Sequence, residues 1–511
     1  MAEHNYGGFT PTLPAIDIRF FSPEQFEHFE AAWRHVGRPP ALSGDGKTRF
    51  NLMSAGTIVE HELRHFHDYL LNRDLLLASW FRRRMFMNAA PLVSKLLRSP
   101  DHDVIPFPLT GWAGLSTQSR GRIRDDLQPL FPLDRNRFWF PRMLRKRHCL
   151  NENRAMLVAV NKAQADEQER LILEVVQADQ AALVPLRNGP DPTALDQLRF
   201  TPRFALEFSA LNTQLQAVIK TYGIKEGFEF AWQLAEEGTV FTRFFFEMLT
   251  FFGSRGRYEG FAPEAIDFPK MKLVAFWIMT GCKNDGAKGS APARLSTLIE
   301  AARQDWDDVF PNHMGPLELL AHFESKMGVT KHQDALRAGH VELSSHVEAA
   351  LRLYGSNPNE AKSQLKTVSG FADVLECRLD LINRVIEDPE QFFDPTKWML
   401  DLNAWPQCPV HLRFVRMGIH RDQFTNFPPE AIYNSFTHLD EDRAKLWVGD
   451  VYIESFFSGT TRVPLSPVVE HQHQLRLFDT LVEPEQVSAL DETIIRQFVR
   501  EHYGKELLRV V

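Results

Sequence analysis

The spacing of apolar and polar positions along most of the chain predicts a mainly helical protein. Apolar residues recur every three to four positions in several long segments, which is the pattern of helices that bury one face. The run of three arginines at 82–84, inside the second of these segments, predicts a solvated turn of helix, with an anionic partner as the alternative. Loops are expected near Gly355 and Gly370. The helical segments lie at 57–71, 75–97, 204–222, 234–252, 268–280 and, with loops, 315–385.

The first 70 residues combine strand and helix patterns. Residues 15–21 alternate apolar with polar side chains, which predicts a strand, and the helix that Ser22 opens continues to about His35. A loop rich in Gly and Pro follows. Residues 51–56 then form a short apolar segment, read as a strand, that ends at a turn, and Ser54 or Thr57 is a candidate N-cap for the next helix. These segments predict a small α/β head.

Beyond residue 386 the pattern becomes mixed. Residues 448–457 and 461–469 alternate as short strands do, which predicts an α+β portion at the C-terminal end of a mostly helical region. We expect two regions along the chain. Residues 1–310 carry the candidate chemistry with helical insertions, and residues 311–511 form a region without a recognisable metal or nucleophile pattern.

Composition and charge narrow the class of protein. At 511 residues with 44% apolar side chains, the chain is long enough for one large or two ordinary cores. A net charge of -8 argues against a general nucleic-acid binder. Neither a signal-peptide pattern nor an apolar run long enough to span a membrane is visible. The four cysteines are far apart, which is typical of reduced thiols and excludes a cysteine zinc knuckle, so we expect a cytoplasmic protein.

The strongest chemical signal is the sequence His-Glu-Leu-Arg-His at residues 61–65. The segment from Thr57 to Leu71 contains no Gly or Pro, so it can form an unbroken helix on which His61 and His65 share one face. Two imidazoles in this arrangement can bind one zinc ion, and Glu62 can accept a proton from a water on that ion. The alternative is a pair of unrelated histidines on an ordinary helix.

This helix resembles the active-site helix of zinc metallopeptidases of the zincin class. The metzincin branch has a Gly and a further His where this chain has Asp68 and Leu71, so that branch is excluded. The gluzincin-like branch remains, and its third zinc ligand is a Glu on a later helix. Asp68 is also a candidate to accept the second ring N–H of His65, or else is a solvated helix residue.

Two glutamates are candidates for the third ligand that the resemblance implies. Glu207 lies among small and apolar residues, where an unpaired carboxylate is costly to bury and where a close helix–helix approach is possible. It is similar in setting to the gluzincin-like ligand. Glu237 stands the same distance before a glycine in a later segment, but its position after Glu236 and before Gly238 is more typical of an exposed helix end. We therefore favour Glu207.

The resemblance implies a zinc-dependent hydrolase that acts on a peptide or protein substrate. Tyr222, Tyr258 and His148 are candidates to stabilise the oxyanion, and the sequence does not choose among them. No Walker loop, dinucleotide-binding glycine motif or serine nucleophile elbow is present. The rival interpretation is a helical interaction protein with a structural or vestigial metal site, in which residues 311–511 bind a protein partner or a second copy of the chain.

Overall fold

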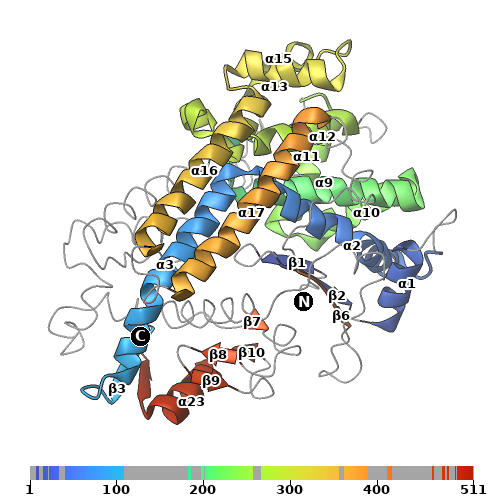
Figure 1. The fold of residues 1–511 in the computed structure, drawn as a ribbon. Helices are drawn as coiled ribbons and strands as arrows, with labels where there is room; N and C mark the ends of the chain where they lie inside the picture. The colour runs from blue at the N-terminus through green and yellow to red at the C-terminus, as the bar shows by residue number, and fades with distance from the viewer. Residues whose placement is uncertain are drawn as a thin grey trace. The chain divides into compact units, whose positions relative to one another are not determined.

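The computed structural model is mainly helical, which confirms the prediction of a mainly α protein (Figure 1). The strand predicted at residues 448–457 lies outside the part of the chain that the structure describes. No helix among the described residues has the length and apolar character that crossing a lipid bilayer would require. The structure describes residues 7–10, 15–20, 22–33, 41–108, 182–185, 197–200, 202–256, 266–355, 362–389, 411–416, 463–464, 475–477, 480–482, 489–490 and 492–509.

The chain divides into two compact units, each built from three separate segments. Each unit therefore combines segments that are far apart in the sequence. The boundary predicted at residue 310 stays a prediction, because units defined by contacts between residues do not test which segments fold on their own. The first unit comprises Met1–Leu76, Gln180–His346 and Asp373–His438, and the second comprises Leu77–Asp179, Val347–Ala372 and Leu439–Val511.

Helix α2, Gly46–Leu71, is the central element of the first unit. Asp45 caps its N-terminus by accepting a hydrogen bond from the backbone N–H of Thr48 at 2.8 Å. Asn72 ends it, and the Asn72 side chain also accepts bonds from the first backbone N–H groups of α3, Arg73–Arg98. The predicted strand at residues 51–56 is wrong, because the Asp45 cap starts the helix before that segment and nothing interrupts it.

Helix α2 is enclosed by other elements for most of its length. Every residue from Leu52 to Leu71 is buried, including the charged ones. A helix that is buried on all sides must place its polar groups against partners on neighbouring elements. Its neighbours in the first unit are helices α1, Pro23–Trp33, α9, Pro202–Tyr222, and α10, Ile224–Glu237, together with strands β1, Gly7–Thr10, and β2, Ala15–Phe20.

A small three-stranded sheet lies against α2. Its middle strand is β2, which confirms the strand predicted at the N-terminus. Ile16, Ile18 and Phe20 of β2 are fully buried, as the period of two expects for one face of a strand. β2 pairs antiparallel with β1 and parallel with β6, His411–Arg416.

The remaining core of the first unit is formed by helices that follow α9. Their apolar faces meet in a cluster of aromatic rings in which Phe252, Trp306 and Phe310 are in mutual contact. The buried guanidinium of Arg294 ties this region together, because it binds Asp285 at 2.6 Å and the carbonyl of Trp277 at 3.0 Å. The helices are α11, Val240–Gly253, α12, Phe268–Met279, α13, Ala291–Gln304, α14, Trp306–Val309, and α15, Pro316–Met327, with the 3-10 helix η2 at Lys283–Lys288.

Arg378 closes the C-terminal end of α2 from a distant part of the chain. It lies on α17, Lys362–Glu387, and donates from Nη1 to the carbonyls of Leu70 and Leu71, the latter at 2.8 Å. The last carbonyls of a helix have no partner within it, and a buried cation is a strong donor for them. The side chain is fully buried, so this contact is part of the core.

The second unit has its own core of aromatic and aliphatic side chains. Trp80 on α3 packs against Phe371 on α17, with ring centroids 4.9 Å apart. Arg84 donates to the hydroxyl of Tyr354, at the end of α16, His332–Gly355, at 2.6 Å. The expected solvated arginine turn is therefore wrong: Arg83 and Arg84 are buried, because both guanidinium groups lie over aromatic rings.

The loop predicted near Gly370 is wrong, because Gly370 lies within the continuous helix α17.

Short strands complete the described elements. The parallel pair β3, Val104–Phe107, and β11, Glu506–Arg509, lies in the second unit beside α23, Glu492–Tyr503. The other pairs are β4–β5, Ala182–Pro185 and Gln197–Phe200, β7–β10, Val463–Pro464 and Ala489–Leu490, and β8–β9, Leu475–Leu477 and Thr480–Val482.

We predict that Gly56→Ala destabilises the protein by about 1–3 kcal/mol, the usual cost of overpacking a core. A Cβ at this position of α2 would stand 2.2 Å from the hydroxyl oxygen of Tyr222, which is itself bonded to His28 at 2.8 Å. Gly370→Ala is the matched control in another helix. A Cβ there meets nothing within 4 Å, so we expect that variant to gain roughly 0.5–1 kcal/mol. Denaturant unfolding of both variants measures the difference, and equal effects would contradict the close packing of α2.

Candidate metal centre

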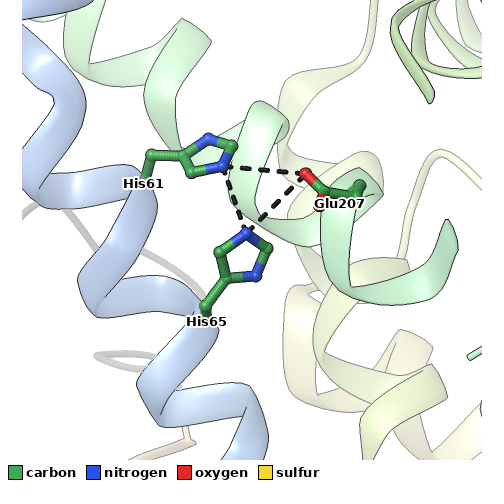
Figure 2. Close-up of side chains that lie close together, drawn as sticks. All are labelled: His61, His65 and Glu207. Carbon is green, nitrogen blue, oxygen red and sulfur yellow. Dashed lines mark hydrogen bonds and ion pairs between the residues drawn. The ribbon is translucent and has the colours of Figure 1, made fainter. Parts of the chain in front are cut away.

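His61 and His65 stand one turn apart on α2 and present their Nε2 atoms to the same point. The two Nε2 atoms are 3.1 Å apart, and the rings meet edge to face with centroids 4.8 Å apart. Figure 2 shows both rings on the side of α2 that faces a neighbouring helix. The predicted sharing of one helix face by these two imidazoles is therefore found in the structure.

The third group of this cluster is Glu207, which comes from α9. Its Oε2 atom lies 3.7 Å from the Nε2 atom of each histidine (Figure 2). The small residues Ala205 and Ser209 beside it are buried, which lets α9 approach α2 closely. The side chain of Glu207 is 22% exposed, about twice the exposure of each histidine, so solvent reaches the cluster on the α9 side.

Helices α2 and α9 run antiparallel beside the cluster. Gly56 lies against Tyr222 at the end of α9, whereas His65, further along α2, lies beside Glu207 near the start of α9. Between these points, the side chain of Gln214 is within hydrogen-bonding reach of His61. A single pair of adjacent helices therefore supplies all three groups.

The distances within the cluster fit one metal ion. Three atoms separated by 3.1, 3.7 and 3.7 Å lie on a circle with a radius of about 2.0 Å, and the usual Zn–N and Zn–O distances are also about 2.0–2.2 Å. Two imidazole nitrogens and a carboxylate oxygen form a common catalytic zinc set that leaves a fourth position for a water or substrate. No other group of three His, Cys, Asp or Glu side chains in the described part of the chain is close enough together to hold a metal.

The three side chains of the cluster change one another's pKa values. Burial and the neighbouring His65 lower the pKa of His61 to about 3. Burial also lowers the pKa of His65, but the Glu207 carboxylate more than offsets it and raises that pKa to about 9. The raised pKa favours a protonated His65, whose Nε2 atom is one of the three candidate ligand atoms, so metal binding must release a proton.

The Nδ1 atoms of the two histidines lack the acceptor that was expected for His65. The Nδ1 atoms of His61 and His65 are buried and have no hydrogen-bond partner among the described residues. Asp68 does not accept a bond from His65, and it is fully buried, so both alternatives predicted for Asp68 are wrong. It lies 2.9 Å from Nε of Arg64 instead, because the cationic guanidinium is the stronger partner for a fully buried carboxylate.

Glu62 is buried beside the cluster without belonging to it. Its side chain follows that of His61 on α2 and is 4% exposed. Its negative charge contributes to the raised pKa of His65, which places the carboxylate within electrostatic reach of the imidazole. Its oxygens lie outside the group of three candidate ligands.

The other candidate residues do not join the cluster. Glu237 is an exposed residue at the last position of α10, so the interpretation as a helix end holds and Glu207 is the glutamate beside the histidines. Tyr222 follows Glu207 by 15 residues on α9, about 22 Å along the helix axis, and its hydroxyl bonds to His28. Tyr222 is therefore too distant to stabilise an oxyanion, and Tyr258 and His148 lie outside the described residues.

Sequence reasoning missed two residues that connect α2 with α9 beside the cluster. Arg64 lies between the two histidines in sequence, and its Nε donates to Ser209 Oγ at 2.7 Å. Ser209 follows Glu207 by two residues. A long cationic side chain in the middle of a helix that must be buried is a signal for a buried ion pair, and the motif drew attention to the histidines alone.

Comparison of the chain with protein-family models, with curated proteins and with solved structures finds no match in any of the three.

Proposed function

We propose that the protein is a zinc-dependent hydrolase that cleaves peptide bonds in a peptide or protein substrate. The observation that carries the proposal is the convergence of His61, His65 and Glu207 at distances that suit one ion. The cluster is buried on the α2 side and opens at Glu207. This combination of a closed ligand face and an accessible side is what a catalytic metal centre requires.

His61, His65 and Glu207 are the residues that would hold the zinc ion. When bound, zinc supplies a Lewis acid that polarises a substrate carbonyl and lowers the pKa of a coordinated water towards ~7. The two histidines would contribute neutral nitrogens, and Glu207 would contribute one negative charge. The positive charge remaining on the loaded site would favour a developing oxyanion on the substrate.

Glu62 is the proposed general base. Its carboxylate accepts a proton from the attacking water and then passes it to the nitrogen of the departing amine. Its burial keeps the carboxylate away from bulk water, and its charge reaches the imidazole of His65. Such a group contributes about 10²–10⁴-fold to the rate of a proton-transfer step.

The proposal extends to the architecture and the setting of the site. Strands β1 and β2 and helices α1 and α2 form the zincin-like head, in which a small sheet lies beside the helix that carries the histidines. The buried free thiols of Cys282 and Cys377 support a reducing compartment, the cytoplasm. Residues 311–511 bind a protein partner or a second copy of the chain.

The test uses the purified full-length chain, loaded with zinc and dialysed. We expect about one zinc per chain by elemental analysis, and cleavage of members of a mixed peptide library, read by mass spectrometry and abolished by a chelator. His65→Ala, purified in the same way, controls for a contaminating peptidase and should neither retain zinc nor cleave. A protein that retains no zinc overturns the proposal. Stoichiometric zinc without cleavage of any peptide or denatured protein favours the helical interaction protein instead.

A further inference from the structure

Beside the metal cluster lies a second set of contacts between α2 and α9 that involves no candidate ligand. The Nε atom of Arg64 donates to Ser209 Oγ at 2.7 Å and stands 2.9 Å from Oδ1 of Asp68. Arg64 and Asp68 lie one turn apart on α2, whereas Ser209 lies on α9. All three are almost inaccessible to solvent, at 2%, 0% and 1% exposure.

The positions of these residues tie them to the cluster. Arg64 directly precedes His65, and Ser209 follows Glu207 by two residues. The two links between the helices therefore start from neighbouring residues on both α2 and α9. A sliding or rotation of α9 that moved Glu207 away from the histidines would also break the Arg64–Ser209 bond.

Asp68 compensates the buried positive charge of Arg64. An uncompensated cation is costly to bury, and an opposite charge in contact with it offsets that cost. Asp68 supplies the opposite charge, 2.9 Å from the same Nε atom that donates to Ser209. The paired guanidinium can then act as a fixed hydrogen-bond donor, because its planar geometry is held by both partners.

We propose that Arg64, oriented by Asp68 and bonded to Ser209, is a positioning residue that fixes the register at which α9 presents Glu207 to His61 and His65. This inference rests on the proposed metal site and adds to it the residues that set its geometry. Fixing the third ligand in advance reduces the conformational freedom that is lost when the ion binds. Residues that orient metal ligands typically change metal affinity 10- to 100-fold when they are replaced.

The experiment measures Co²⁺ binding to the full-length chain by visible absorption, with zinc competition to obtain the affinities. Ser209→Ala removes the bond between the helices and leaves the Arg64–Asp68 pair in place. We expect its affinity for both ions to fall about 10-fold or more and its Co²⁺ absorption band to shift. Arg64→Lys is the second variant, which keeps the charge beside Asp68 but lacks the planar donor, and the same changes are expected.

Thr213→Val is the matched control. Thr213 is one turn further along α9, equally buried, and its hydroxyl bonds to the carbonyl of Ser209 in the same helix, with no bond to α2. Removing this hydroxyl should change metal affinity less than about threefold, even if the unfolding midpoint of Thr213→Val falls as far as that of Ser209→Ala. A larger loss in Thr213→Val than in Ser209→Ala would show that general stability, and not the helix register, controls the affinity.

The outcomes separate this inference from the proposed function. Unchanged affinity and an unchanged absorption band in both Ser209→Ala and Arg64→Lys overturn the positioning role and leave the metal site intact. The expected losses in a protein that cleaves no peptide support the positioning role and contradict only the hydrolase. A wild-type chain that binds neither ion overturns the metal site and the positioning role together.

Discussion

Glu62→Gln is expected to reduce peptide hydrolysis by about 10²–10⁴-fold, the contribution of a general base, while the protein still binds one zinc ion per chain. The reason is that Gln has the shape of Glu but cannot accept a proton from the attacking water. Glu62 lies outside the three-residue cluster, so the ligands are unchanged. Initial rates on a substrate found in the library screen, together with zinc content, measure both effects.

Glu60→Gln is the matched control for this experiment. Glu60 is also a buried carboxylate on α2, two residues before Glu62, and its charge acts on Lys220 and Tyr222 at the other end of α9 from Glu207. We expect its hydrolysis rate to stay within about threefold of wild type, because an isosteric change away from the ligands leaves the proton acceptor in place. Equal losses in the two variants, or full activity in Glu62→Gln, would remove Glu62 from the mechanism.

Glu207→Gln is expected to weaken zinc binding by about 10²–10³-fold. Structural zinc sites with four ligands bind with roughly 10–16 kcal/mol, so one ligand accounts for about 2.5–4 kcal/mol. The amide that replaces the carboxylate keeps the volume but loses the negative charge that faces both imidazoles at 3.7 Å. Competition with a chromogenic chelator gives the affinity directly.

Glu237→Gln distinguishes the two glutamates that the sequence leaves open. It makes the same chemical change at the exposed end of α10, so zinc affinity should stay at the wild-type value. A large loss in Glu237→Gln with none in Glu207→Gln would reverse the assignment of the third ligand. Losses in neither would mean that His61 and His65 share the ion with a residue outside the described cluster.

Sequence reasoning predicts those features of the site that depend on residues close together in the chain. His61 and His65 share a face because they are four residues apart on a helix, and the absence of Gly and Pro after Thr57 is enough to expect that helix. The candidate glutamate was found by the cost of burying a carboxylate among small residues, and the structure brings that residue to the histidines.

Non-local contacts account for what the sequence did not predict. The start of α2 depends on the side chain of Asp45, which lies 12 residues before the expected first residue of the helix. The burial of Arg84 depends on Tyr354, and that of Arg64 on Ser209, at separations of 270 and 145 residues. Helical periodicity does not report such partners, so the sequence predicts a solvated turn at the arginine triplet and assigns no partner to Arg64.

The bond from Arg378 to the end of α2 has a consequence for synthesis on the ribosome. Arg378 lies 307 residues after Leu71 in the chain. At a synthesis rate of about 5–20 residues per second, Arg378 is added roughly 15–60 s after Leu71. During that interval the terminal carbonyls of α2 must bind water or another segment. A nascent chain stopped at residue 310 holds both histidines and Glu207 yet lacks this partner, so the C-terminal end of the helix that carries the histidines gains its buried partner only late in translation.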